Sequence, residues 1–189
     1  MAKYRAKRFR IAFLFYVLIL SVSFLFVDIT YSKVAYAVPI KGTPGNDNLS
    51  GTPADDSIQS GRGNDNVVGL AGNDVIESAQ GTDNVKGSVG NDYINGGQDA
   101  DLLYGEIGND EINGGEGRDQ LFGGPDDDVL YGGLSNDILN GEDGNDRLFG
   151  GPGNDTLTGG RGADFFDCGM GLDVVKDYMS LEGDIIVGC

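Results

Sequence analysis

A nine-residue period runs through most of this sequence and restricts the folds open to it more than any other feature. An apolar side chain stands two positions after the marker Asp of every copy, as at Leu49, Ile58 and Val175. Gly fills the position five residues before the Asp in twelve of fifteen copies, and the position two residues before it in eleven. The fifteen marker residues are Asp47, Asp56, Asp65, Asp74, Asp83, Asp92, Asp101, Asp110, Asp119, Asp128, Asp137, Asp146, Asp155, Asp164 and Asp173. So strict a short period predicts a repeat architecture between residues 42 and 176.

Each position of the period has a physical reason. A backbone that turns twice through left-handed dihedral angles within five residues favours Gly, which has no Cβ to clash there. The phrase GGxGxD is therefore a loop. The apolar residue, flanked by two others, forms a short strand with one inward side chain. Loops and short strands that alternate with this period predict an all-β chain folded as a parallel β-solenoid.

Residues 42–176 resemble the hemolysin-type calcium-binding (RTX) nonapeptide repeat family. The phrase GGxGxDxUx, with U apolar, is plainest at residues 150–158, GGPGNDTLT, and at residues 114–122, GGEGRDQLF. The resemblance implies a right-handed parallel β-roll of about fifteen nonapeptide repeats, two repeats to a coil. Alternate strands would form two facing sheets, and Ca²⁺ ions would lie between successive loops along each edge.

The fifteen Asp residues are the predicted metal ligands. The sequence contains no His, and a site built from oxygen atoms alone favours a hard cation. Ca²⁺ suits irregular glycine-rich loops better than Mg²⁺, which demands a nearly ideal octahedron. Loops that face each other along an edge are eighteen residues apart, so Asp119, Asp137 and Asp155 would share one edge. With eight loops on one edge and seven on the other, the roll would offer at most about 13 sites.

Some repeats depart from the phrase, and we expect their loops to bind calcium loosely or not at all. Among the departures are Ser60 and Ser78 at the first position, Leu70 and Ala79 at the second, and Ala54, Asp99, Asp126 and Ser135 at the fourth. The four at the first and second positions all lie within residues 60–91, a degenerate stretch. Residues 105–167 follow the phrase most closely and should hold the tightest sites.

Residues 1–37 predict export. The first ten residues carry five of the thirteen basic side chains, and residues 11–27 are apolar or hydroxyl-bearing. This run is shorter than the ~20 residues that comfortably span a bilayer. Cleavage after Ala37, in the A-x-A sequence of residues 35–37, would release a secreted, extracellular protein. An uncleaved membrane anchor that leaves the repeats facing outside stays the alternative.

The charge excludes anionic partners. Residues 1–37 hold six of the 13 basic side chains and one of the 30 acidic ones, so the remainder has 7 basic and 29 acidic side chains and a net charge of −22. Such a chain repels nucleic acid and anionic membranes. Solubility alone does not explain the acidity, because fifteen of the twenty-four Asp residues share one phase of the period.

Beyond the roll of residues 38–176 the period breaks. Residues 177–189 keep apolar side chains but lose the glycine spacing, which is typical of an end cap that prevents edge-to-edge growth. The two cysteines, Cys168 and Cys189, are predicted to pair in an exported protein and to stabilise this end by roughly 3 kcal/mol.

Aromatic side chains recur at outward strand positions. Tyr104 and Phe122 are eighteen residues apart, as are Tyr131 and Phe149. We expect each pair to stack across neighbouring strands and stiffen the roll. A strip that binds carbohydrate is the alternative.

The sequence predicts a protein that is not an enzyme. Without His it can form neither an HExxH zinc site nor a Ser-His-Asp triad, and it has no GxSxG elbow and no P-loop. The predicted function is calcium binding by a secreted or surface structural or adhesive repeat protein, which folds on Ca²⁺ outside the cell. The alternatives are an accessory or remnant module of a secreted enzyme and a carbohydrate-binding surface protein. Besides calcium ions, a cell-surface, polysaccharide or protein partner stays open, and a membrane is expected only if the N-terminal segment is uncleaved.

Overall fold

A computed structural model describes residues 39–189. The predicted signal peptide or anchor at residues 1–37 lies outside the described residues. All regular structure in the described part is β-strand, joined by tight loops. Residues 39–189 contain no helix long and apolar enough to cross a membrane.

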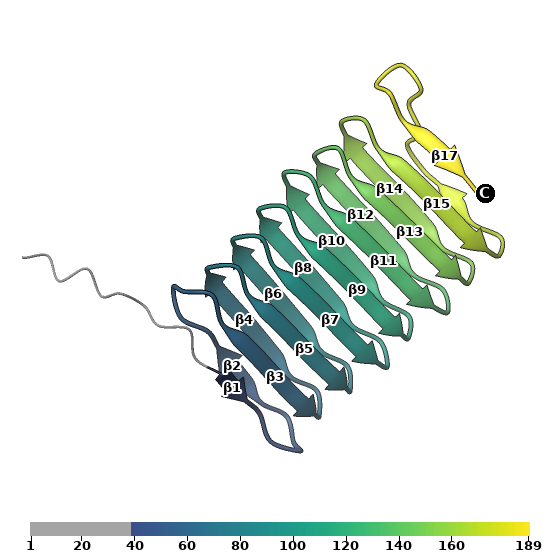
Figure 1. Cartoon of the computed structure of the whole chain (residues 1–189). Coiled ribbons are helices and arrows are strands. Elements are labelled where there is room, and N and C mark those ends of the chain that lie inside the picture. The colour runs from purple at the N-terminus through teal and green to yellow at the C-terminus, as the bar shows by residue number, and fades with distance from the viewer. Residues whose placement is uncertain (1–38) are drawn as a thin grey trace, which may run out of the picture. The chain divides into compact units, whose positions relative to one another are not determined.

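The strands form two sheets, each built of parallel strands, that face each other across the roll (Figure 1). Sheet A has nine strands, in the order β1 Pro39–Lys41, β3 Ser57–Arg62, β5 Val75–Gln80, β7 Tyr93–Gln98, β9 Glu111–Glu116, β11 Val129–Leu134, β13 Arg147–Pro152, β15 Phe165–Met170 and β17 Ile185–Val187. Sheet B has eight, in the order β2 Asn48–Ser50, β4 Asn66–Ala71, β6 Asn84–Val89, β8 Leu102–Ile107, β10 Gln120–Pro125, β12 Ile138–Asp143, β14 Thr156–Arg161 and β16 Val174–Val175.

The register confirms the predicted two repeats per coil. Leu121 of β10 pairs with Leu139 of β12, and Leu130 of β11 pairs with Leu148 of β13. These partners are eighteen residues apart, so each residue lies beside its equivalent two repeats later. Consecutive repeats therefore supply strands to opposite sheets. The fold class is the predicted all-β parallel β-solenoid.

The core is a double row of the apolar residues that follow the marker Asp. Each sheet points one such side chain per strand into the space between the sheets, as the alternation of a β-strand requires. Ile40, Leu49 and Val175 pack against the two ends of these rows. The fully buried members are Ile58, Val67, Ile76, Val85, Ile94, Leu103, Ile112, Leu121, Leu130, Leu139, Leu148, Leu157 and Phe166.

The loops keep their left-handed conformation even where the sequence lacks Gly. Leu70 at the second position of its repeat has φ of 87°, and Asp126 at the fourth position of its repeat has φ of 84°. The other residues of this kind are Ala79, Ser88, Asp99, Glu106, Ser135 and Glu142. The stacked coils impose the turn, and a non-glycine residue there is strained by its Cβ.

The C-terminal segment predicted as a cap adds a further strand to sheet A. Phe166 of β15 pairs with Ile186 of β17, a separation of twenty residues instead of eighteen. The disulfide Cys168–Cys189, with Cα atoms 5.0 Å apart, ties the residue two positions beyond β17 to β15. The expected pairing of the two cysteines is confirmed, and two extra residues account for the loss of the period.

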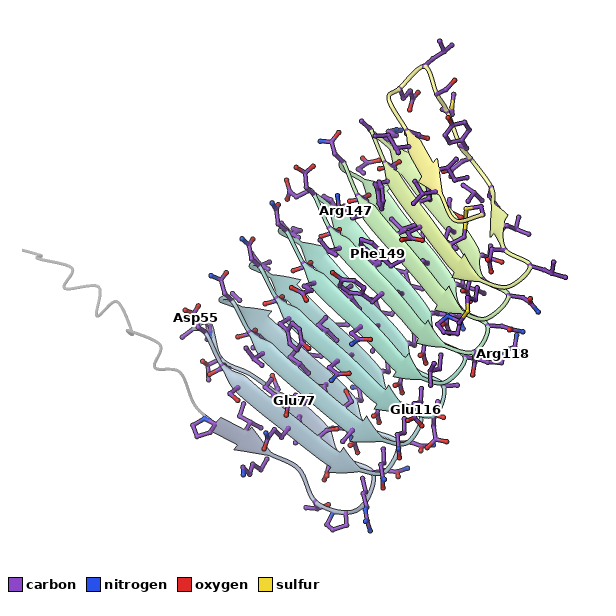
Figure 2. The ribbon with its side chains drawn as sticks, turned by 45° about the vertical axis from the view of Figure 1, so that its right-hand side comes forward. Asp55, Glu77, Glu116, Arg118, Arg147 and Phe149 are labelled. Atoms are coloured by element: carbon purple, nitrogen blue, oxygen red, sulfur yellow. A yellow bond between two sulfur atoms is a disulfide. The ribbon has the colours of Figure 1, made fainter. Side chains whose placement is uncertain are left out.

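The outward aromatic residues stack as expected. The ring centroids of Tyr104 and Phe122 are 5.0 Å apart on sheet B, and those of Tyr131 and Phe149 are 4.9 Å apart on sheet A. Arg147 extends the second stack, because its guanidinium lies over the rings of Phe149 and Phe165 (Figure 2). These contacts run along the roll and link neighbouring coils.

Replacing Leu70 by Gly should stabilise the roll. Leu70 is 41% exposed and lies outside the core, so its replacement leaves the core packing intact, while the left-handed backbone no longer carries a Cβ. We expect Leu70→Gly to raise the free energy of unfolding by about 1 kcal/mol, measured by denaturant unfolding in saturating calcium. Leu70→Ala is the control, because it keeps the Cβ. An equal gain in both variants would contradict the strain argument.

Candidate metal sites

The marker Asp residues line the two edges of the roll. The eighteen-residue register places Asp110, Asp128 and Asp146 in neighbouring loops of one edge, and Asp119, Asp137 and the other alternate markers along the opposite edge. From Asp56 to Asp164 every marker side chain is buried, with at most 3% of its surface exposed. The predicted grouping of the Asp residues into two rows is therefore what the fold produces.

One oxygen of each carboxylate holds two coils together. The backbone N–H of Asp110 donates to Oδ1 of Asp128 at 2.7 Å, and that of Asp137 donates to Oδ1 of Asp155 at 2.9 Å. The same bond joins every successive pair of markers along both edges, from Asp47 to Asp173. The markers thus form two continuous ladders of hydrogen bonds.

The second oxygen of most of these carboxylates is buried and has no hydrogen-bond donor. Leaving a buried polar atom unpaired is costly, and the cost is greater for a charged group. A regular row of such atoms indicates that a cation belongs there. The oxygens concerned are Oδ2 of Asp65, Asp74, Asp83, Asp92, Asp101, Asp110, Asp119, Asp128, Asp137, Asp146 and Asp155.

Where Gly fills the first position of the phrase, a backbone carbonyl of the next strand in the same sheet borders the same space as Oδ2. A Cβ placed on Gly150 would lie 2.6 Å from Oδ2 of Asp155 and 2.6 Å from the carbonyl oxygen of Cys168. A Cβ on Gly132 would meet Oδ2 of Asp137 at 2.7 Å and the Gly150 carbonyl oxygen at 2.6 Å. Glycine at the first position of the phrase therefore keeps open a small space that carboxylate and carbonyl oxygens border.

This donor set fits Ca²⁺. Within residues 39–189 no three acidic or cysteine side chains gather closely enough to hold an ion by side chains alone. Calcium takes six to eight oxygen ligands and accepts backbone carbonyls among them. The marker Asp residues would supply carboxylate oxygens and the glycine-rich loops would supply carbonyls. The bound ion would contact the buried Oδ2 atoms and balance the negative charge of their carboxylates.

The first two loops satisfy their carboxylates without an ion. The backbone N–H and the hydroxyl of Thr43 donate to Oδ2 of Asp47 at 2.6 and 3.0 Å. Thr52 donates to Oδ2 of Asp56 in the same way, at 2.5 and 2.9 Å. Both loops share the sequence Gly-Thr-Pro, a signal for this difference that our reading of the repeats overlooked. Asp47 and Asp56 differ from the other predicted ligands for this reason.

In the degenerate repeats, a serine in place of the first glycine alters the candidate calcium site. Ser60 occupies the first position of the Asp65 repeat, and its hydroxyl donates to the carbonyl oxygen of Ser78 at 2.8 Å. In repeats with glycine at the first position, the equivalent carbonyl borders the open space and could bind an ion. In this repeat the Ser60 side chain occupies that space. The geometry gives a physical reason for the weak binding expected in this part of the chain.

Asp184 continues one ladder, although it is out of phase with the repeats. The backbone N–H of Asp164 donates to its Oδ1 at 3.0 Å, and the N–H of Met179 donates to its Oδ2 at 2.7 Å. The period alone did not reveal Asp184, because it lies twenty residues after Asp164. The dipeptide Gly183-Asp184 before three apolar residues was the available signal.

Burial raises the pKa of the ladder carboxyl groups, because desolvation disfavours their charged form. The backbone hydrogen bond to Oδ1 offsets part of this effect, and neighbouring Asp residues add to the rise. The pKa is raised to about 8 at Asp101 and Asp128. It is raised to about 7 at Asp110, Asp137 and Asp146. Without a cation, Asp101 and Asp128 of the folded roll are therefore mostly protonated at neutral pH.

The calcium-free chain should fold more readily in acid. A carboxyl group whose pKa is higher in the folded chain stabilises the fold fully below its unfolded pKa, and this contribution is lost as the pH rises through the folded pKa. The raised values run from about 6 at Asp83 and Asp92 to about 8 at Asp101 and Asp128. We expect the β-sheet circular dichroism signal in chelator to be greater at about pH 5 than at about pH 8. A signal that rose with pH would contradict this sign.

Comparisons with known proteins bear on the same residues. A model of the RTX calcium-binding nonapeptide repeat, in four copies, matches residues 41–76, 78–112, 104–139, 113–148, 131–166 and 140–175. A comparison with curated proteins gave no match. The matched segments cover more than half of the chain and coincide with the coils that carry the Asp ladders. The chain therefore belongs to the RTX calcium-binding nonapeptide repeat family.

Proposed function

We propose that this protein is a calcium-dependent structural module without enzymatic activity, and that it folds when its loops bind Ca²⁺ outside the cell. The observation that carries the proposal is the row of eleven buried Oδ2 atoms without a donor. Family membership supports calcium as the ion. The repeats themselves form the scaffold and account for nearly all of the described residues.

The coupling of folding to calcium follows from the charges. The described residues carry a large excess of acid, and each edge brings carboxylates of the same sign together in successive coils. The core offers only one large apolar side chain per nine residues against this repulsion. An ion that binds only the folded chain stabilises it by mass action, once for each site. The chain is then expected to be largely disordered without calcium.

Two features support a location outside the cell. The disulfide Cys168–Cys189 is typical of oxidising compartments, and residues 1–37 have the composition of an export signal. Calcium sites of extracellular modules commonly bind at 10⁻⁴ to 10⁻³ M, above cytosolic calcium levels. Such a chain would be exported unfolded and would fold on arrival. An adhesive or matrix role is consistent with a roll in which stacked aromatic residues on the outer faces link neighbouring coils.

Calcium should fold the chain. We expect the protein in chelator at neutral pH to show a largely disordered circular dichroism spectrum, and added calcium to produce a β-sheet spectrum with a cooperative melt, because the ion offsets the buried charge. The midpoint of the calcium titration should lie near the millimolar range. A full β-sheet spectrum in chelator would contradict the folding proposal. A midpoint in the micromolar range or below would contradict the location switch alone.

Asp137→Asn tests the ladder directly. The variant keeps Oδ1 as the acceptor for Asp119 but replaces the charged Oδ2 by an amide. We expect a higher calcium midpoint and a cooperative melt at least several degrees lower at fixed calcium, for a loss of about 1–3 kcal/mol. Asp99→Asn is the matched control, since Asp99 is an exposed loop residue outside the ladders. Equal effects in both variants would show that only net charge matters.

A further inference from the structure

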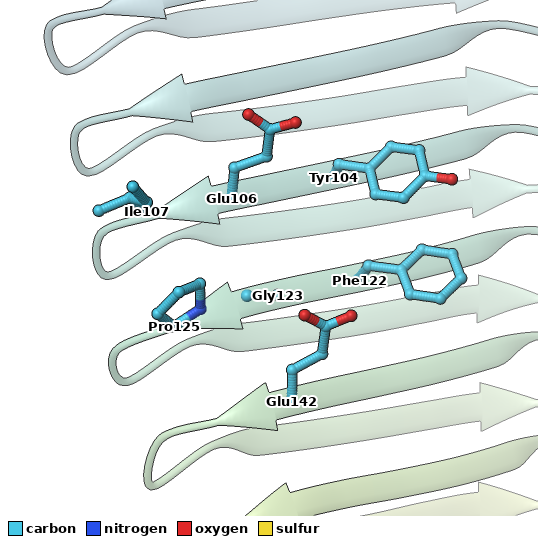
Figure 3. A pocket seen from close by; sticks show the side chains of 8 residues that line it. Tyr104, Glu106, Ile107, Phe122, Gly123, Pro125 and Glu142 are labelled. Atoms are coloured by element: carbon cyan, nitrogen blue, oxygen red, sulfur yellow. The ribbon is translucent and has the colours of Figure 1, made fainter.

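The outer face of sheet B contains a small hollow between two glutamates. It has a volume of about 200 Å³, and its floor is Gly123 and Gly124 of β10. Glu106 of β8 and Glu142 of β12 flank the floor on neighbouring strands (Figure 3). The remaining walls are apolar: Tyr104, Phe122, Ile107 and Pro125. The hollow exists because Gly124 interrupts a row of side chains that Glu106 and Glu142 continue on either side.

Elsewhere on the same face the chain fills an equivalent place with its own lysine. The Lys86 ammonium lies 2.9 Å from Oε1 of Glu106 and 5.2 Å from the ring centroid of Tyr104. The carboxylate thus holds the ammonium beside an aromatic ring. The Glu106 hydrogen bond and charge also raise the pKa of Lys86.

Glu142 repeats the position of Glu106 two coils further along the roll, but no lysine accompanies it. Lys86 stands twenty residues before Glu106, and Phe122 stands twenty residues before Glu142. Figure 3 shows both glutamates leaning in the same direction, so the Glu142 carboxylate is directed back toward β10 and Phe122. Among the described residues, Glu142 is in neither of the two ion pairs. Phe122 thus occupies the place that corresponds to Lys86, and Asn140 the place that corresponds to Tyr104. The Glu142 carboxylate has an aromatic ring on the neighbouring strand and, within residues 39–189, no cation beside it.

We propose that this hollow binds the ammonium group of a lysine side chain presented by a cationic protein or peptide partner. The Glu142 carboxylate would accept the ammonium, and Phe122 would supply the aromatic surface. Ile107 and Pro125 would contact the aliphatic stem, as apolar surfaces commonly do for lysine. The acidic surface of the roll attracts such a partner over a distance and raises its association rate. The inference does not depend on which loops bind calcium.

The shape and chemistry favour an ammonium over another calcium ion. The hollow offers the single carboxylate of Glu142, because Glu106 already holds Lys86, and calcium requires six to eight oxygens. An ammonium needs only a few acceptors and gains from an aromatic neighbour. The pairing of Lys86 with Glu106 shows that a glutamate at this position of the outer face can accept an ammonium group.

The test uses a capped trilysine peptide and the calcium-loaded protein, followed by nuclear magnetic resonance of the backbone amides. We expect the largest shift changes at Phe122, Gly123 and Gly124. Glu142→Gln should weaken binding about fivefold without altering the calcium-induced β-sheet spectrum, which tests the proposed folding separately. Glu116→Gln is the matched control: it removes the same charge from an exposed position of β9, on the other sheet. It should leave the affinity nearly unchanged.

Two results would overturn the proposal. Shift changes spread along both acidic edges, with equal weakening in Glu142→Gln and Glu116→Gln, would show that the peptide recognises only net charge. Unchanged binding of a peptide with acetylated lysines would show that the ammonium is not recognised. Phe122→Leu separates the ring from its bulk, because it retains an apolar wall and should weaken binding while the calcium-induced fold persists.

Discussion

The hydrogen bond from each marker Asp N–H to the next marker carboxylate is the interaction on which the rest of the structure depends. It sets one coil on the next, and it requires the carboxylate to turn inward, where water cannot reach it. With Oδ1 used in this way, Oδ2 is left buried without a hydrogen-bond donor. The regularity of the roll and its need for a cation therefore have the same cause.

The chain meets this need differently along its length. Thr43 and Thr52 donate to the first two carboxylates, so the start of the roll needs no ion there. Ser60 takes a carbonyl that would otherwise be free for a ligand. In the repeats nearest to the consensus, the glycines of the loop supply no side-chain donor, so the Oδ2 atoms of the marker Asp residues have no hydrogen-bond partner. Buried Oδ2 atoms without a donor are thus a property of particular loops and not of every coil.

The side chains on the outer faces of both sheets are also placed by the stacking of the repeats. A side chain lies beside its equivalents eighteen residues away, so aromatic rings stack and opposite charges pair along the roll. An interruption in a row then has a local consequence. At Gly124 the missing side chain leaves Glu142 and Phe122 beside an open hollow, whereas the equivalent glutamate two coils earlier has its own lysine.

The nine-residue period by itself predicted the all-β solenoid, the inward apolar side chain of each repeat and the regular placing of the Asp residues, because stacked identical repeats bring equivalent residues together. The resemblance to the family implied two repeats per coil, and the eighteen-residue register confirms it. The period could not reveal how each loop uses its carboxylate. The Ser60 hydroxyl and Asp184, which joins the ladder across two inserted residues, depend on contacts between coils. The threonine donors act within their own loop, four residues before the Asp. Only the tertiary structure decided these contacts, because the period gives the spacing of the residues and not the direction in which a hydroxyl or a carboxylate oxygen points.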